Sequence, residues 1–212
     1  IKLEITDVNN EAYSANGRMI AKTYASGSFW GQKQISIYDT KNSTLDFFEI
    51  TGPYYSENSA RNPVVMVDAI NWEPTGTELI FDYLTCRPVP DSECEQFWSL
   101  GILNVKTGRI RYPFPSSNPL IDLGFPAFSK TRKDIFIFDY QNWEDTNENG
   151  QPGNYVLIYN ESSGEIIYGG YSNDTVVEGY EDELINSTWG IPSFIGSDEG
   201  FVMQSQTAKK TR

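Results

Sequence analysis

The sequence contains no histidine. Histidine is the commonest general base and the commonest ligand of transition metals, so a Ser-His-Asp triad and a histidine-based zinc site are excluded within this chain. No apolar run approaches the roughly 20 residues of a membrane-spanning helix, and we therefore expect no membrane insertion.

Basic residues are scarce, with 16 Lys and Arg against 29 Asp and Glu, and the formal net charge is −13. A surface this acidic repels phosphate backbones and anionic membranes, which makes nucleic acid a poor partner. The same charge favours the binding of cations.

Only two cysteines are present, Cys86 and Cys94, and they fall within one predicted loop. We expect a local disulfide that pins a hairpin, with two reduced thiols as the alternative. A disulfide would place the chain in an oxidising compartment, either extracellular or periplasmic. The sequence begins at Ile1 without a methionine, so we expect that a targeting segment has been removed or that the chain is a piece of a longer protein.

The remaining composition favours β-structure. Aromatic residues make up 14% of the chain, and Val, Ile, Thr, Tyr and Phe cluster in short runs bounded by turn residues, as strands require. At 212 residues the chain can bury a substantial core. We predict an all-β chain that forms one region over residues 1–212.

The predicted strands recur in one order: four antiparallel strands joined by short connections. This order predicts three complete units and a partial fourth, at about 6–52, 64–116, 122–170 and 188–206. Equivalent aromatic residues mark the first strand of each unit: Tyr13, Trp72, Phe128 and Phe194. Their spacing exceeds the ~40–45 residues of a propeller blade, and the excess lies in the loops.

A short sequence that occurs twice in the chain supports the repeat. Ile80-Phe81-Asp82-Tyr83 recurs as Ile137-Phe138-Asp139-Tyr140 at the same place in the second strand. The stretch Trp72–Phe81, with its Glu-Pro-Thr-Gly turn, resembles the TolB-like, WD40-like β-propeller repeat. Tyr13–Ala21 and Phe128–Phe138 are weaker copies, and the second of them lacks the turn glycine.

This resemblance covers almost the whole chain and implies a β-propeller built of four-stranded antiparallel blades. It says little about function, because such propellers serve as binding platforms, as enzyme lids and as enzymes. Three complete units are few for a closed ring of four to eight blades, so we expect a fragment of a larger propeller rather than a closed four-bladed one. The strands predicted at Ile1–Ile5 and Phe201–Gln204 would present sheet edges, which favour self-association or docking on further blades.

One loop has the pattern of a calcium site. Within 145–151, the residues at loop positions 1, 3 and 5 carry oxygen ligands, a glycine stands at position 6, and position 7 would contribute its carbonyl. The predicted ligands are Asp145, Asn147, Asn149 and Gln151. Position 12 is Val156 rather than the bidentate Glu, so a carboxylate from elsewhere would have to complete the site. The alternative is a solvated acidic turn.

Two further groups of side chains are candidates for function. Trp30 and Trp143 fall in predicted loops, where they could bind a sugar or a protein partner or simply pack over the base of their own loop. Asp68, Asp82 and Asp139 lie on or near predicted inner strands and could in principle support glycoside hydrolysis. Because Asp82 and Asp139 share a repeat position, a structural role such as capping a turn is the competing interpretation.

Together these features predict a secreted or periplasmic propeller scaffold that binds a protein or a glycan, with a structural calcium loop. A carboxylate-based, glycan-active enzyme is the alternative hypothesis.

Overall fold

The computed structural model of this chain describes residues 8–25, 32–55, 60–61, 63–87, 94–115, 118–146, 152–171 and 187–207. Strands in this part form three four-stranded antiparallel sheets and two two-stranded ones. No helix in the described part is long and apolar enough to cross a membrane. The all-β prediction is therefore confirmed, while the strand expected at Ile1–Ile5 lies outside the described residues.

Each four-stranded sheet is a meander in which consecutive strands are neighbours. The first contains β1 (Val8–Tyr13), β2 (Met19–Tyr24), β3 (Gln34–Asp39) and β4 (Thr44–Glu49). The second contains β7 (Val64–Trp72), β8 (Glu78–Arg87), β9 (Glu95–Asn104) and β10 (Arg109–Arg111). The third contains β11 (Ile121–Phe128), β12 (Ile135–Thr146), β13 (Pro152–Asn160) and β14 (Glu165–Tyr171). A hairpin of β15 (Ser187–Ile195) and β16 (Gly200–Thr207) follows.

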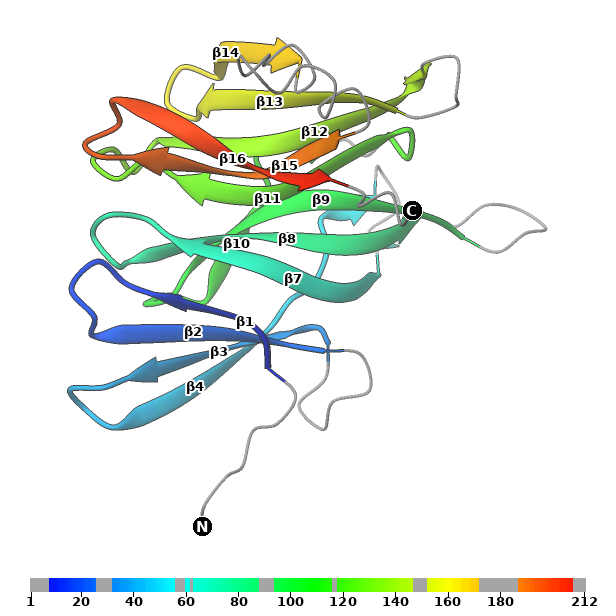
Figure 1. Cartoon of the computed structure of the whole chain (residues 1–212). Helices are drawn as coiled ribbons and strands as arrows, with labels where there is room; N and C mark the ends of the chain where they lie inside the picture. Colours follow the sequence, from blue (N-terminus) through cyan, green and yellow to red (C-terminus); the bar gives the residue numbers. More distant parts are fainter. Residues whose placement is uncertain are drawn as a thin grey trace, which may run out of the picture.

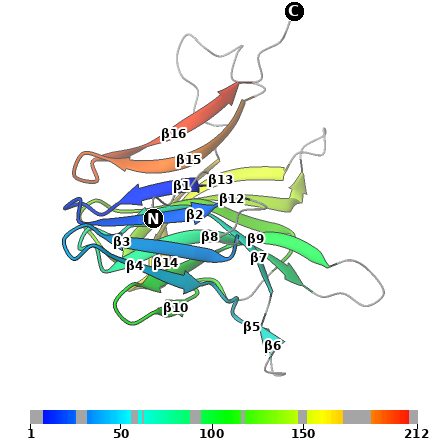
Figure 2. The same ribbon diagram turned by 90° about the horizontal axis from the view of Figure 1, so that it is seen from below.

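One element differs from the sequence prediction. Trp143, expected in a loop, lies on strand β12, whose ladder with β13 continues through polar residues: Gln141 pairs with Asn154 and Asn142 with Gly153. Between β4 and β7 the chain also forms a short hairpin of β5 (Tyr54–Tyr55) and β6 (Ala60–Arg61), which lies outside the sheets in Figure 2.

The three four-stranded sheets are stacked in chain order, and β15 of the last hairpin contacts β11 and β12 (Figure 1). In the described part of the chain the stack does not close into a ring. The first strands of successive units contact one another, β1 with β7, β7 with β11, and β11 with β15. This is the radial arrangement of propeller blades, in which the first strand of each blade is the innermost.

Apolar layers between neighbouring sheets form the core. Alternate residues of β8 point to its two faces, so Leu79 and Phe81 join the layer shared with the first sheet and Ile80 joins the layer shared with the third. Its repeat partner on β12 behaves in the same way, because Phe138 packs toward the second sheet and Ile137 toward β15. The two copies of the Ile-Phe-Asp-Tyr sequence thus occupy equivalent places.

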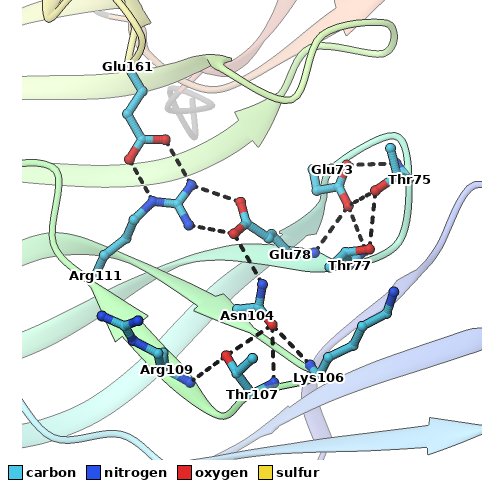
Figure 3. A network of polar contacts seen from close by, with 10 residues as sticks. All are labelled: Glu73, Thr75, Thr77, Glu78, Asn104, Lys106, Thr107, Arg109, Arg111 and Glu161. Carbon is cyan, nitrogen blue, oxygen red and sulfur yellow. Dashed lines mark hydrogen bonds and ion pairs between the residues drawn. The ribbon is translucent and has the colours of Figure 1, made fainter.

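Tight turns lie at one end of the stack, on the left in Figure 1, and polar side chains close them. Glu73 is buried and accepts hydrogen bonds from the N–H groups of Thr75 (2.6 Å), Thr77 (2.5 Å) and Glu78 (3.1 Å), as Figure 3 shows. Gly76 completes this turn with φ +71°, a conformation that glycine adopts without strain.

The turn of the third unit, which lacks glycine, is held by the fourth unit instead. Asp198 accepts hydrogen bonds from the Ser129 hydroxyl (2.7 Å) and the Lys130 N–H (2.7 Å). An arginine links the second and third sheets at the same end. Arg111 on β10 pairs with Glu78 of its own sheet (2.7 Å) and with Glu161 of the third (2.6 Å), as Figure 3 shows. Contacts with Glu161 and Glu78 raise the pKa of the Arg111 guanidinium.

Candidate functional site

An acidic cavity lies beside the inner strands of the second and third sheets. It is toward the strand ends opposite the tight turns; these strand ends are on the right in Figure 1 and are called the loop end below. Its volume is about 240 Å³. Four aspartates, two aromatic residues and three others line it: Asp68, Asp82, Asp122, Asp139, Trp98, Phe125, Leu123, Gly124 and Gln141. No basic side chain is among these lining residues.

The innermost strands create the recess because each of them is bulged. The pairing register shifts between Val67 and Ile70 in β7 and between Gly124 and Ala127 in β11. A bulge leaves backbone N–H groups outside the ladder, and a buried N–H needs another acceptor.

Asp82 supplies that acceptor for two sheets at once. Its Oδ1 accepts the N–H of Ala69 from the bulge of its own sheet (2.7 Å), and its Oδ2 accepts the N–H of Phe125 from the bulge of the next sheet (2.8 Å). Thr23 has the equivalent place on β2. It accepts the Asn10 N–H (3.2 Å) and donates to the Asp68 carbonyl in the next sheet (2.8 Å). The role of Asp82 is therefore structural, as the repeat position indicated, but it joins bulges rather than capping a turn.

Asp139 holds the same position on β12, but it does not connect two bulges by hydrogen bonds as Asp82 does. Ala69 and Phe125 are equivalent, each three residues before its repeat aromatic, and both donate to Asp82. Phe125 has φ +48°, which is uncommon outside glycine. Because the Phe125 N–H is engaged by Asp82, the one donor to Asp139 among the described residues is the Gln141 side-chain amide, at 3.4 Å. Asp139 is 3% exposed, and its buried Oδ1 has no hydrogen-bond partner in the described part of the chain.

The other two aspartates are bound at the rim. Asp68 accepts hydrogen bonds from the side-chain amides of Asn9 and Asn10. Asp122 accepts the Trp98 N–H (2.7 Å) and the indole N–H of Trp143 (2.8 Å). None of the ion pairs in the described part of the chain involves any of the four aspartates.

Burial without a counter-charge changes the protonation of this group. Burial raises the pKa of Asp82 to about 7, with the Asp68 charge adding to the rise and the Phe125 and Ala69 N–H groups opposing it. Burial also raises the pKa of Asp139 to about 7. Burial raises the pKa of Asp68, against the effect of Asn10 and Asn9. The cavity is thus poised to gain or lose protons near neutral pH.

Trp143 lies at the edge of this site. Its side chain is 44% exposed, and its indole N–H is anchored on Asp122. Trp30 lies outside the described residues. A second cavity of about 260 Å³ shares Trp98 and Leu123 with the first and is otherwise largely aromatic and aliphatic, with Phe97, Phe114 and Phe138 among its walls. The loop end therefore offers an acidic recess beside an apolar one.

The calcium prediction falls largely outside the described residues, which exclude Asn147, Asn149 and Gln151. Asp145 is described: it is exposed, and its Oδ2 accepts a hydrogen bond from the Tyr155 hydroxyl (2.7 Å). In the described part of the chain, no three acidic or cysteine side chains come close enough together to hold a metal ion.

A disulfide joins Cys86 and Cys94 across the β8–β9 connection, with their Cα atoms 5.5 Å apart. This separation is typical of disulfides. The expected pairing is therefore present, at the same end of the stack as the acidic cavity.

Sequence reasoning identified Asp68, Asp82, Asp139 and Trp143 as candidates but not Asp122, Trp98 or the bulges. The available signal was positional: Ala69 and Phe125 stand at one offset before the repeat aromatic. Nothing in residue type alone distinguishes a bulged inner strand from a regular one.

No protein-family model matches the chain, and no curated protein matches its sequence. Solved structures do match. TolB from Acinetobacter baumannii is similar over 96% of this chain and 39% of its own, at 12% identity and a TM-score of 0.53. The β-propeller domain of the Trilobed protease from Pyrococcus furiosus is similar over 94% and 48%, at 11% identity and a TM-score of 0.50.

Oligogalacturonate lyase from Vibrio parahaemolyticus is similar over 97% of this chain and 48% of its own, at 9% identity and a TM-score of 0.53. This chain spans less than half the length of each of these three proteins. At such identities the similarity shows the fold alone, and that fold is propeller-like.

Proposed function

We propose that this chain belongs to an extracellular or periplasmic β-propeller that acts as a binding scaffold for a protein or glycan partner. The supporting observation is the acidic cavity with an exposed tryptophan anchored at its rim. Concave sites with a few convergent polar groups are where ligands usually bind, and exposed aromatic residues commonly anchor partners.

Binding of the wild-type chain to peptide and glycan arrays tests this proposal. Gly124→Val would place a side chain in the cavity, and a Cβ there meets only Asp82 Oδ2, at 3.5 Å. Lys106→Ala changes an exposed residue in a turn at the opposite end and serves as the control. Saturable binding that Gly124→Val abolishes and Lys106→Ala preserves is expected. No saturable ligand, or equal binding by all three proteins, would contradict a binding role for this end.

The alternative is a glycan-active enzyme. The observation in its favour is that burial raises the pKa of Asp82 and of Asp139 to about 7 in one cavity that also contains Asp68 and Asp122. Glycosidases pair a carboxylic acid of raised pKa with an ionised carboxylate. Against it, both oxygens of Asp82 are engaged by backbone N–H groups. Reducing-sugar release that Asp68→Asn or Asp139→Asn abolishes would establish the enzyme and overturn the scaffold.

We further propose that the chain is part of a larger propeller or associates with itself. Three complete sheets are fewer than the four to eight blades of closed propellers, and exposed strand edges promote pairing. Light scattering coupled to size-exclusion chromatography measures the mass in solution. A stable monomer in which the β16 amides exchange rapidly with solvent would contradict this proposal, because neither a partner nor ring closure would then protect this edge.

The disulfide between Cys86 and Cys94 supports an extracellular or periplasmic location, since such bonds persist in oxidising environments. Alkylation of native protein without reductant, followed by intact-mass measurement, should leave Cys86 and Cys94 unmodified. Two alkylated thiols would remove the basis for this localisation.

Calcium binding by the loop 145–151 remains a proposal that rests on its sequence pattern. A bound ion there would rigidify the connection between β12 and β13 beside Trp143.

A further inference from the structure

The acidic cavity gathers carboxyl groups for which the described chain supplies no basic partner. Among the described residues, its lining includes four aspartates and no basic residue. Charged groups that are buried without a partner are destabilising, and proteins retain them mainly where they act. Asp139 is the clearest case, because it is 3% exposed and its Oδ1 has no hydrogen-bond partner.

Comparison with the equivalent residues of the other units shows that the missing hydrogen-bond donor is particular to Asp139. The equivalent Thr23 and Asp82 each join the bulge of their own sheet to that of the next. Among the described residues, Asp139 receives no N–H from a bulge, because Phe125 donates to Asp82 instead. Asp139, one of the residues that line the cavity, thus carries a buried acceptor without a donor among the described residues, beside lining residues that are largely acidic and aromatic.

We propose that this cavity binds a primary alkylammonium group, and that Asp139 Oδ1 accepts one of its N–H donors. This inference rests on the proposed binding function and names the chemistry of the ligand. The ammonium could belong to a free alkylamine or to a lysine side chain of a peptide, and the experiment below separates the two sources.

A metal ion fits less well than an ammonium. Metal ligands must converge within about 2.0–2.6 Å of one point, and in the described part of the chain no three acidic or cysteine groups do so. An ammonium group on an alkyl chain reaches carboxylates that are farther apart, because each contact is a hydrogen bond of about 2.7–2.9 Å.

A guanidinium also fits less well. Its planar fork binds best to both oxygens of one carboxylate, whereas an ammonium is a point charge with three separate donors. Asp82 and Asp122 each have both oxygens engaged by N–H donors of the chain. Asp139 offers its free Oδ1, and Asp68 is hydrogen-bonded through Oδ1 alone.

The size and walls of the cavity agree with this ligand. Its volume of about 240 Å³ is below the ~300–1,000 Å³ of drug-sized sites and suits a group of side-chain length. Trp98 and Phe125 line it as well, and aromatic faces attract ammonium groups.

Isothermal titration calorimetry on the whole chain at low salt tests the proposal. The ligands are n-butylamine, Nα-acetyl-lysine N-methylamide, butylguanidine and the neutral butan-1-ol. We expect both amines to bind, butylguanidine to bind more weakly and butan-1-ol not to bind. Tighter binding of the lysine derivative than of butylamine assigns the site to peptides, and the reverse order assigns it to free amines.

Three variants locate the site. Asp139→Asn should weaken amine binding by about tenfold or more, because it removes a charged acceptor. Gly124→Val should abolish amine binding by filling the cavity, which provides a second route if Asp139→Asn fails to fold. Asp46→Asn, which removes an exposed carboxylate on β4, should leave the affinity unchanged.

The outcomes separate this inference from the proposed function. Equal binding of butylamine and butan-1-ol, no amine binding, or equal loss in Asp46→Asn and Asp139→Asn would overturn the inference. A glycan or amine-free peptide that binds in a manner sensitive to Gly124→Val would overturn it while the scaffold function stands. If no array ligand and no amine binds, both the proposed function and the inference are overturned.

Discussion

Replacement of Asp139 by asparagine should remove a pH-dependent destabilisation of the native chain. Burial raises the pKa of this carboxyl from 3.8 to about 7. The native state therefore holds a proton that the unfolded chain releases at lower pH. The contribution of this carboxyl to the free energy of unfolding is greatest below the pKa of the unfolded state. It is lost as the pH rises through the pKa of the native state, because ionising the buried group is costly.

The size of the effect follows from the shift. About three pKa units correspond to roughly 4 kcal/mol when the group is fully ionised in both states. Since the unfolded carboxyl is already ionised at pH 5, about 2–3 kcal/mol of this should appear between pH 5 and pH 8.5. The amide of asparagine does not titrate, so the variant should gain stability relative to wild type by that amount as the pH rises. The unsatisfied N–H groups of the introduced asparagine cost about 1–3 kcal/mol at every pH, so they add a constant to the difference in stability and do not change its pH dependence.

Urea unfolding followed by tryptophan fluorescence measures the free energy of unfolding at each pH. Asp46→Asn is the matched control, because it makes the same chemical change at an exposed site on β4. Its difference from wild type should stay nearly constant. A difference between Asp139→Asn and wild type that also stays flat from pH 5 to pH 8.5 would refute the assignment of a buried, unpaired carboxyl at this position.

Three further predictions concern other parts of the fold. Arg111→Met should lower the free energy of unfolding by about 1–2 kcal/mol, since two partly buried glutamates lose their partner while solvent screens part of the effect; a loss that persists undiminished in high salt would argue against an ionic link. Gly101→Ala should lower the free energy of unfolding by about 1–3 kcal/mol, because its Cβ would overlap the Phe81 ring, and a urea unfolding curve that matches wild type would show that the ring can move aside. Millimolar calcium should raise the melting temperature of wild type but not of Asp145→Ala, and an equal response in both would return this loop to an ordinary acidic turn.

The secondary-structure class and the repeated units could be predicted from the amino-acid sequence. Alternating and β-branched runs favour strands, Gly and Asn favour turns, and the repeated Ile-Phe-Asp-Tyr sequence marks equivalent positions in two sheets. The acidic balance and the close cysteine pair are also sequence properties, and the Cys86–Cys94 bridge is present in the structure. These features are local, so short-range patterns encode them.

The different roles of Asp82 and Asp139 could not be predicted from the sequence, because they depend on contacts between sheets: Asp82 joins two bulges, whereas Asp139 Oδ1 has no partner among the described residues. Asp82 and Asp139 are indistinguishable by repeat position, and their difference arises from one backbone N–H of Phe125 that belongs to a different sheet from Asp82. Asp122 likewise became part of the site through contacts with Trp98 and Trp143. These hydrogen-bond partners depend on how the bulged strands of neighbouring sheets pack against each other, and the residue pattern along one strand does not specify that packing.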